Sequence, residues 1–594
     1  MLASAMLLIV RDGIVERSAR ANQANVVHDR NVAVPMRDGV LLRADVLRPS
    51  DGRVPTLVYR TPYGKDDTLK EDTTFTRAVE RGYAVVVQDV RGRYASDGEF
   101  RPYENEGRDG YDTIEWAARQ PWSNGHVGTF GLSYPGAVQW LAAVENPPHL
   151  DAMVPAMTFS TPQNFFYSGG TWDMSWFEWI WRNIAPDVRA KQGLPNPTRQ
   201  ERAVSWKALE EKMLKTLPLD QVHELRDVAP YYYDWLHHPP EDRFWDFAEL
   251  RNKYSRTSAA VLNLSGWHDD NYGPDGATTN YVGLVQARHQ DTSRAALLIG
   301  PWTHGVDSTA RTKFGERDFG RAAAIDYDDV VIGWMDRYVR GNGSGGGGDR
   351  AAAPVRYFVM GENRWRESKT WPPPGEARTY YLSPSGGSGA HGGLTDTPPT
   401  RPSSSSALLS DPANPVVNPY GSAGAHDYRA LSERRDVLTF DSAPLTGDIE
   451  VTGSIQARVY ISCDCRDTDL WVRVLDVAPD GAAYNLMSPG VDVVRASYRK
   501  LDTLDTSANS SRKRELLEPG QVYELAVVRP VTSNLFQRRH RVRVQVSTSF
   551  FPNFSRNLHT GELETVSSRM QRATIRVYHD RDRPSQISLP VASR

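Results

Sequence analysis

Three short segments of this chain carry residues that together could perform nucleophilic catalysis. They are Gly-Leu-Ser-Tyr-Pro-Gly at 131–136, Gly-Trp-His-Asp-Asp at 266–270 and Gly-Pro-Trp-Thr-His-Gly at 300–305. A serine, a carboxylate and a histidine can form an activated nucleophile, because the histidine removes the serine proton and the carboxylate orients the histidine. The candidate residues are Ser133, Asp269 and His304.

The candidate serine lies where a strand-like segment gives way to a helix-like one. The apolar, partly β-branched run at 126–131 predicts a buried strand, and the run at 137–144 predicts a helix. A serine on such a turn stands clear of the sheet, and the next amide, that of Tyr134, begins a helix where backbone donors face a developing oxyanion. Pro135 occupies the usual glycine position, which an early helical position tolerates.

The other two candidates follow strand-like segments. Residues 261–265 run into Asp269, and residues 296–300 run into His304 at the end of what we expect to be the last strand of the sheet. Ligands bind at the carboxyl ends of strands in open parallel sheets, so both placements suit a catalytic site. Asp270 is a direct rival of Asp269, because counting along the strand does not separate them.

The elements that must position these residues alternate between strand and helix from residue 41 to about 158, which predicts a mostly parallel sheet with helices on both faces. After a glycine-rich stretch the apolar period becomes two, which predicts a β-sandwich of jelly-roll type. We therefore expect an α/β-hydrolase core with an inserted helical cap and a C-terminal all-β jelly roll. The expected divisions are an N-terminal extension (1–25), the catalytic domain (26–160 and 258–342), the cap (161–257), a linker (343–354) and the jelly roll (355–594).

The expected cap is rich in tryptophan. Trp172, Trp176 and Trp179 recur at i, i+4 and i+7, which predicts one face of a helix. Such a stripe can form the core of the cap, or one of its rings can line the acyl site, and the sequence leaves both readings open.

Composition excludes several classes of function. The chain has 594 residues, 39% hydrophobic and 24% charged, with a net charge of −3. This balance argues against a general role in binding nucleic acid. No apolar run is long enough to span a bilayer, and residues 3–10 do not resemble a secretory signal, so we expect no membrane association and a cytoplasmic protein. The oligomeric state stays open, with a homodimer among the options.

Two cysteines, Cys463 and Cys465, alternate on one expected strand with Val459 and Ile461. We expect them to be small core residues, because the i, i+2 spacing would strain a mutual disulfide. Without a clustered histidine they also make a poor zinc site, and His268 beside two aspartates lacks a second histidine. We therefore expect no metal and no organic cofactor.

Together these motifs resemble the cocaine-esterase and X-prolyl dipeptidyl-peptidase family of serine hydrolases. The resemblance covers roughly residues 30–590 and includes Arg-Thr-Pro-Tyr at 60–63 and the segment at 89–100. It implies the hydrolase core, cap and jelly roll, favours Asp269 over Asp270 as the acid, and makes Ser133, Asp269 and His304 the triad. It also implies that the Tyr63 hydroxyl and the Tyr134 amide form the oxyanion hole.

The resemblance leaves the substrate open. The related α-amino-acid ester hydrolases carry carboxylates at positions that here hold Lys65, Asn271 and Tyr272. The lack of these carboxylates counts against α-amino acyl substrates. Lys65 could instead favour a neutral or anionic acyl group. We expect a carboxylesterase acting on small molecules. The alternatives are an X-Pro dipeptidyl-peptidase, an amide or β-lactam side-chain acylase, and a non-catalytic carbohydrate- or partner-binding protein. The candidate pocket residues are Lys65, Trp172, Trp176, Trp267, Asn271 and Tyr272.

Overall fold

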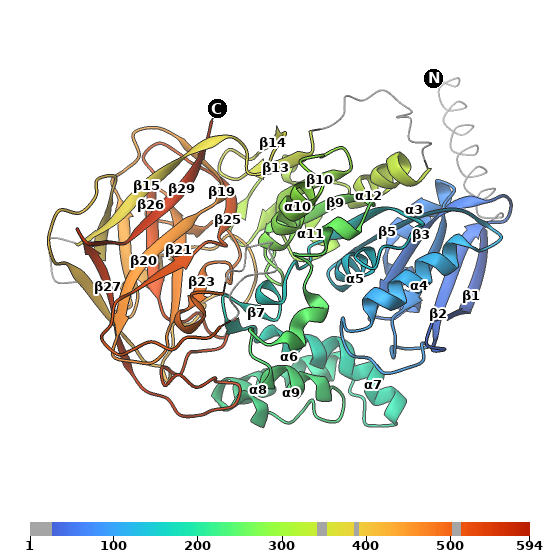
Figure 1. Cartoon of the computed structure of the whole chain (residues 1–594), viewed down its shortest axis with the longest axis horizontal. Coiled ribbons are helices and arrows are strands. Elements are labelled where there is room, and N and C mark those ends of the chain that lie inside the picture. The colour runs from blue at the N-terminus through green and yellow to red at the C-terminus, as the bar shows by residue number, and fades with distance from the viewer. Residues whose placement is uncertain (1–25, 341–352, 385–390, 502–512, 594) are drawn as a thin grey trace, which may run out of the picture. The chain divides into compact units, whose positions relative to one another are not determined.

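The computed structural model of the chain describes residues 26–340, 353–384, 391–501 and 513–593 (Figure 1). The chain divides into two compact units. The first unit covers Met1–Pro155, Arg256–Val261 and Tyr327–Arg350, and the second covers Ala156–Ser255, Leu262–Asp326 and Ala351–Arg594. The expected N-terminal extension and most of the expected linker lie outside the described residues.

The first unit is built on a sheet with the strand order β1-β2-β4-β3-β5-β6. Strand β3 pairs in parallel with both β4 and β5, whereas β1 and β2 form an antiparallel pair that continues onto β4. Strand β4 is buried along its whole length, as its continuous apolar run requires for a central parallel strand. The strands are β1 (Val26–Pro35), β2 (Leu41–Pro49), β3 (Val54–Thr61), β4 (Ala84–Asp89), β5 (Ser123–Leu132) and β6 (Leu150–Ala156).

Helices of the first unit connect and cover these strands. Helix α5 follows β5 directly and is buried at every position, which its almost wholly apolar sequence allows. Helix α5 packs against α4, and α12 packs against α3. The helices are α2 (Lys65–Glu71), α3 (Thr73–Glu80), α4 (Glu106–Ala118), α5 (Tyr134–Ala143), α12 (Tyr327–Met335) and the π-helix η7 (Asp336–Arg340).

The second unit contains four strands in the order β9-β10-β13-β14. Strand β13 pairs in parallel with β10, and β14 pairs antiparallel with β13. The sequence assigned residues 355–361 to the jelly roll and made the His304 strand the last of the sheet, and both assignments are wrong. An apolar run such as Val355–Val359 suits a buried strand of either sheet, so its pattern could not choose. The bounds are β9 (Ala260–His268), β10 (Ala295–Thr303), β13 (Val355–Val359) and β14 (Arg364–Ser368), with α10 (Asp275–Ala287) and α11 (Val306–Thr309) between the first three and a small β11–β12 hairpin (Lys313–Phe314, Arg317–Asp318) before β13.

The segment from residue 160 to residue 257 is predominantly helical and belongs to the second unit. Trp172 does not share a helix with Trp176 and Trp179, because it lies in a two-residue strand and the helix begins only at Ser175. Thr198 and Glu201 form a reciprocal capping box that starts the longest helix of the segment, α8. The elements are β7 (Tyr167–Ser168), β8 (Thr171–Trp172), α6 (Ser175–Trp179), the π-helix η2 (Ile180–Ile184), α7 (Ala185–Gln192), α8 (Arg199–Lys215) and α9 (Pro230–His237), with short 3-10 turns η1, η3, η4 and η5 between residues 162 and 256.

The C-terminal part of the second unit is an all-β sandwich, coloured yellow to red in Figure 1. Most of its strands pair antiparallel, and β16 with β18 is a parallel pair. The strands are β15 (Gly375–Pro384), β16 (His391–Thr395), β17 (Ser405–Ser410), β18 (Leu438–Ser442), β19 (Ile449–Ser454), β20 (Gln456–Cys463), β21 (Asp469–Val477), β22 (Ala483–Asn485), β23 (Val493–Arg495), β24 (Tyr523–Val527), β25 (Val531–Phe536), β26 (Arg541–Ser547), β27 (Ala573–Asp580), β28 (Arg583–Pro584) and β29 (Gln586–Ala592).

The sandwich core follows from the alternation in these strands. On β26, Val542, Val544 and Val546 are at most 1% exposed and join one hydrophobic cluster. Gln545 on the opposite face is also buried, because its amide donates to Tyr428 O and Ser432 Oγ. The alternation of residues therefore predicted the apolar face of β26 correctly. The opposite face, which the alternation predicted to be solvated, is partly covered by other residues.

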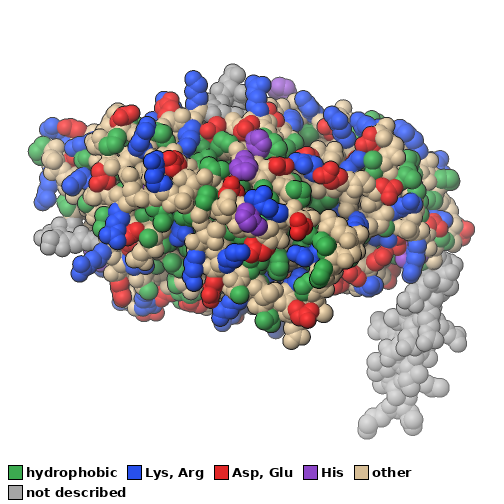
Figure 2. All heavy atoms as spheres, turned by 90° about the horizontal axis from the view of Figure 1, so that it is seen from below, with side chains coloured by type: hydrophobic (Ala, Val, Ile, Leu, Met, Phe, Trp, Pro, Cys, Tyr) green, Lys and Arg blue, Asp and Glu red, His purple; other side chains and the backbone are tan. Residues whose placement is uncertain are grey.

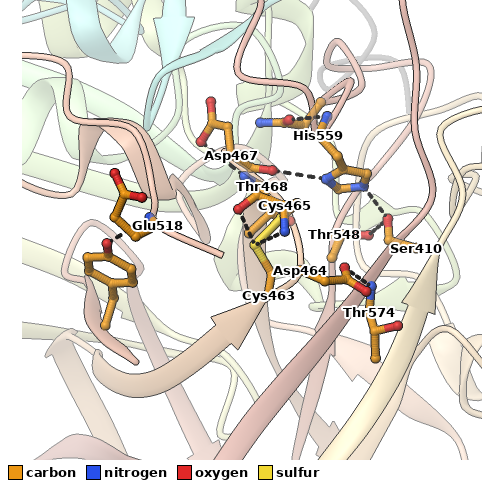
Figure 3. The surroundings of a disulfide bond; sticks show 12 residues. Ser410, Cys463, Asp464, Cys465, Asp467, Thr468, Glu518, Thr548, His559 and Thr574 are labelled. Atoms are coloured by element: carbon orange, nitrogen blue, oxygen red, sulfur yellow. Dashed lines mark hydrogen bonds between the residues drawn. A yellow bond between two sulfur atoms is a disulfide. The ribbon is translucent and has the colours of Figure 1, made fainter. Parts of the chain in front are cut away.

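The two cysteines form a disulfide, contrary to the expectation from their spacing. Strand β20 ends at Cys463, and the chain then bends, so the two Cα atoms are 5.1 Å apart rather than at the spacing of an extended strand. Asp464 between them accepts a hydrogen bond from the Thr574 amide at 2.7 Å (Figure 3).

The surface carries both signs of charge. Figure 2 shows basic and acidic side chains interspersed over the face it presents, in keeping with the net charge of −3. Within the described ranges, no helix has the length and apolar character needed to cross a bilayer.

Candidate active site

Ser133 occupies a strained turn between β5 and α5 of the first unit. Its φ is 69° and its ψ is −126°, a conformation that side chains other than glycine rarely adopt. Gly131, two residues earlier, has a φ of +140°, and a Cβ there would lie 2.5 Å from Pro135 Cβ. The glycine is therefore needed for the sharp turn, which is the local geometry of a nucleophile elbow.

The buried Tyr134 side chain holds this turn in place. Tyr134 is fully buried, its hydroxyl donates to Glu106 Oε1 at 2.7 Å, and its ring stacks on Tyr103. Glu106 also forms a buried ion pair of 2.9 Å with Arg60 at the end of β3. Burial raises the pKa of the Tyr134 hydroxyl well above its usual range, and the nearby Glu106 carboxylate adds to the effect, so this group stays a donor. Its amide stands at the first position of α5, where amides have no partner within the helix.

Tyr63 and Lys65 follow β3 in the same unit. Tyr63 is partly exposed, and its amide donates to Thr61 Oγ1 at 3.1 Å. Lys65, in contrast, is only 4% exposed, and its ammonium pairs with Asp45 at 2.9 Å and with Asp66 at 2.8 Å. Two carboxylates therefore already neutralise the Lys65 ammonium. For this reason we do not propose that Lys65 binds an anionic acyl group.

Asp269 and His304 come together in the second unit from the ends of neighbouring strands. His304 Nδ1 lies 2.9 Å from Asp269 Oδ1, which also accepts the Asn271 amide at 3.1 Å. Gly266 permits this approach of β9 to β10, because a Cβ there would lie 2.2 Å from the Trp302 carbonyl oxygen. With Nδ1 as donor to the carboxylate, His304 Nε2 carries the lone pair of a general base.

The electrostatics of this pair favour the charged imidazole. Burial acts to lower the pKa of His304, but the charge and hydrogen bond of Asp269, together with the charge of Asp270, raise it above its usual value. Asp270 is exposed and makes no hydrogen bond to the His304 side chain among the described contacts. Asp269 is therefore the carboxylate that orients His304.

The candidate pocket residues divide into two groups. Trp172, Trp176 and Trp267 are buried, and the two indoles with partners, Trp176 and Trp267, donate to the Phe165 and Phe358 carbonyls. They pack among other aromatic rings and act as core. Tyr272 lies 5.6 Å from the His304 ring, and Asn271 lines a cavity, so only these two border the acid–base pair in the second unit.

That cavity contains residues outside the candidate triad and the candidate pocket residues. His268, next to Asp269, lines it together with Asp173 and Asp270. The described residues contain no group of three or more side chains arranged to hold a metal ion. The position of His268 next to the candidate acid was visible in the sequence. Asp173, however, lies 96 positions before Asp269, and nothing in the sequence linked it to His268.

Comparison with known proteins settles the family. A family model described as X-Pro dipeptidyl-peptidase (S15 family) matches residues 38–306, and one described as the X-Pro dipeptidyl-peptidase C-terminal non-catalytic domain matches residues 350–588. The cocaine esterase of Rhodococcus sp. is 34% identical, over 95% of this chain and 98% of that protein. The chain belongs to the cocaine-esterase and X-Pro dipeptidyl-peptidase family of serine hydrolases.

Two solved structures share the fold of this chain. An α-amino acid ester hydrolase is 25% identical with a TM-score of 0.77, over 96% of this chain and 97% of that chain. An aminopeptidase from a marine sediment archaeon, Thaumarchaeota archaeon, is 21% identical with a TM-score of 0.78 over the same shares of the two chains. Each likeness covers 96% of this chain, which includes both its α/β-hydrolase core and its C-terminal β-sandwich.

Proposed function

We propose that this chain hydrolyses carboxylic esters of small molecules through an acyl-enzyme intermediate. Ser133 is the nucleophile, His304 is the general base and acid, and Asp269 orients the imidazole. The Tyr63 hydroxyl and the Tyr134 amide stabilise the oxyanion.

The hydrogen bond between His304 and Asp269 carries this proposal. It fixes the tautomer in which Nε2 can accept a proton, and it comes from the carboxyl ends of two strands, as the family order of serine, acid and base requires. The positive φ of Ser133 supports the nucleophile assignment independently, because strained backbone at residues other than glycine clusters at active sites.

The reaction would proceed in two acyl transfers. His304 removes the Ser133 proton as Oγ attacks the ester carbonyl, and the carbonyl electrons move onto the oxygen that the two donors hold. The intermediate collapses, the C–O bond to the alcohol breaks, and His304 returns the proton to the leaving alkoxide. A water molecule then attacks the acyl-enzyme by the same route, releasing the carboxylic acid and restoring the serine hydroxyl.

An X-Pro dipeptidyl-peptidase is the second candidate function. The description of the family model that matches residues 38–306 favours it. The cocaine esterase, however, matches 95% of the chain at 34% identity, which supports the ester as the main substrate. The same triad would serve both reactions, so the two candidates differ in what binds the substrate rather than in how the bond breaks.

A substrate panel with an active-site label tests the proposal. We expect turnover of p-nitrophenyl acetate and butyrate, labelling of Ser133 by a fluorophosphonate, and little turnover of Gly-Pro-p-nitroanilide. The Ser133→Ala variant should lose both label and activity, with kcat lower by about 10⁴–10⁶-fold. Absence of turnover and of label in the wild type would exclude a serine hydrolase, whereas preferential cleavage of the anilide would replace the esterase by the peptidase.

A further inference from the structure

The loop that follows β4 lies against the turn that carries Tyr63. Strands β3 and β4 are parallel neighbours, and Thr61 at the end of β3 lies opposite Asp89 at the end of β4. Both strands therefore end at the same edge of the sheet, where the turn at 62–64 and the loop at 90–105 begin. The Val90 amide makes the first contact between them, because it donates to the Thr61 carbonyl at 3.0 Å.

A buried arginine of this loop holds the carbonyl group directly before Tyr63. Arg93 is fully buried, and its Nε donates to the Pro62 carbonyl oxygen at 2.8 Å. That oxygen belongs to the planar peptide unit that ends at the Tyr63 Cα, so the bond fixes the plane from which the Tyr63 side chain departs. A hydrogen bond from a charged donor is also about twice as strong as one between neutral groups.

A buried carboxylate holds the backbone on the other side of Tyr63. Asp89 is 1% exposed, and its Oδ1 accepts the Lys65 amide at 2.7 Å. This contact is to the backbone of Lys65, whose ammonium pairs elsewhere, with Asp45 and Asp66. Only the peptide unit that joins Tyr63 to the next residue lies between the two anchored units.

Aromatic rings keep the Arg93 guanidinium and the turn in contact. The guanidinium lies over the rings of Tyr94 and Phe100, 5.1 and 5.2 Å from their centroids. Tyr94 also packs on the turn, because a Cβ at Gly64 would lie 2.9 Å from the Tyr94 Cζ. The loop bends sharply at Gly92, where φ is +72° and a Cβ would lie 2.2 Å from the Phe100 amide nitrogen.

We propose that Arg93 and Asp89 are positioning residues that set the place of the Tyr63 hydroxyl in the oxyanion hole. The inference rests on the proposed ester hydrolysis, in which this hydroxyl is one of the two oxyanion donors. Such a donor must lie about 2.7–3.1 Å from the oxygen that develops charge, and a misplacement of about 1 Å can cost about 10²-fold in rate. Because Tyr63 is partly exposed, the core does not enclose its ring, and the anchored backbone limits where the ring can point.

The size of the effect distinguishes positioning from direct catalysis. Because Arg93 acts through Tyr63, its loss should cost no more than loss of the Tyr63 hydroxyl itself, about 10²–10³-fold in kcat. We expect Arg93→Met, which keeps a long side chain and removes the donor, to lower kcat for p-nitrophenyl butyrate about 10–100-fold with little change in KM. Arg93→Lys keeps a charged donor and should recover part of this loss.

A double-mutant cycle tests whether the effect passes through Tyr63. In the Tyr63→Phe background, Arg93→Met should lower kcat by less than about twofold, because the donor that Arg93 positions is already absent. Asp89→Ala should lower kcat about tenfold in the wild type and less than about twofold in the same background. Asp89→Asn keeps an acceptor for the Lys65 amide and should retain most of the activity.

Arg53→Met is the matched control for the hydrogen bond. Arg53 Nε likewise donates to a backbone carbonyl, that of Ser123, at 2.7 Å. It precedes the first residue of β3, at the end of the strand opposite to the Tyr63 turn. We therefore expect Arg53→Met to keep the kcat of the wild type.

Fluorine NMR of 3-fluorotyrosine placed at position 63 reports on the ring without any need for turnover. We expect its resonance to shift or broaden in Arg93→Met and in Asp89→Ala, and to match the wild type in Arg53→Met. Asp89→Ala removes a separate anchor, so it gives both readouts even if Arg93→Met fails to fold.

The inference is wrong if Arg93→Met and Asp89→Ala leave kcat unchanged, if they lower it equally in the Tyr63→Phe background, or if the fluorine resonance is the same in both. A Tyr63→Phe variant with unchanged kcat would also overturn it. If the wild type lacks ester turnover, the proposed hydrolysis fails, and the fluorine resonance alone decides whether the two residues position Tyr63. The two failures are therefore distinguishable.

Discussion

The Tyr134 hydroxyl donates a hydrogen bond of 2.7 Å to Glu106, and this bond ties the residue after the candidate nucleophile to the start of α4. Glu106 in turn pairs with Arg60 on β3, the strand that leads to Tyr63. One buried network of the first unit therefore supports both the elbow and the segment that carries the proposed oxyanion tyrosine.

Breaking this network should destabilise the protein in a graded way. Tyr134→Phe leaves a buried carboxylate oxygen without its donor, and we expect a loss of about 1–3 kcal/mol. Glu106→Gln leaves the buried Arg60 guanidinium without its counter-charge, and we expect about 3–5 kcal/mol. Chemical denaturation measures both. Tyr111→Phe, on a partly exposed ring under Arg37, is the control and should be near neutral. An equal loss in Tyr134→Phe and in the control would contradict the role of the bond.

The two neighbouring aspartates should differ in kinetics. Asp269→Asn replaces the carboxylate that fixes the His304 tautomer by an amide, which can also donate, and we expect kcat to fall by about 10⁴-fold. Asp270→Asn leaves that bond in place and should keep most of kcat.

The pH profile supplies a second test of the same pair. The base acts when deprotonated, so the acid limb of kcat/KM reports the pKa of His304. Both carboxylates raise that pKa, so removal of either charge should shift the acid limb to lower pH, and more for Asp269→Asn than for Asp270→Asn. A shift toward higher pH in either variant would mean that another group controls the limb.

Tyr63→Phe should lower kcat for p-nitrophenyl butyrate by about 10²–10³-fold, because it removes one oxyanion donor. KM should change little, since the donor acts on charge that develops in the transition state. Thermal unfolding should match that of the wild type, because Tyr63 is partly exposed and its amide contact to Thr61 is retained. A loss confined to KM would assign Tyr63 to substrate binding instead.

Gly266→Ala should damage the acid–base pair from within the sheet. The added Cβ would meet the Trp302 carbonyl and force β9 away from β10, so we expect destabilisation of about 1–3 kcal/mol and a fall in kcat. Gly333→Ala on α12 is the matched control, because a Cβ there meets nothing within 4 Å, and alanine is the better helix former. Calorimetric unfolding of the two variants should move in opposite directions.

Most of the core fold could be predicted from the sequence because its signals are local. The strand before Ser133, the helix after it and the strands before Asp269 and His304 each follow from a run of fewer than fifteen residues. The errors arose where pairing with a distant strand, rather than the local sequence, decides the sheet to which a strand belongs. Val355–Val359 reads as a strand of any sheet, and only its pairing with Leu297–Ile299 assigns it to β10.

The site was predictable to the same extent. Chain order and strand ends placed His304 and left Asp269 and Asp270 as rivals, the family resemblance favoured Asp269, and its hydrogen bond with His304 is visible only in three dimensions. Lys65 looked free because its partner Asp45 lies on strand β2, 20 residues earlier in the chain. The cavity was hidden for a similar reason, since most of its walls come from stretches of the chain that are far from the motif at 266–270 and show no motif of their own.

The pairing of β13 and β14 with β10 limits how this protein can be divided. A protein truncated at the glycine-rich stretch would lack β13 and β14, the strands that follow β10 in the sheet. The backbone of β10, which ends beside His304, would then be an unpaired edge and could aggregate. The part of the chain after the glycine-rich stretch is thus not an interchangeable module. Exchange of the C-terminal module between relatives should preserve a working hydrolase only when the junction falls after Ser368, beyond the last strand that the two parts share.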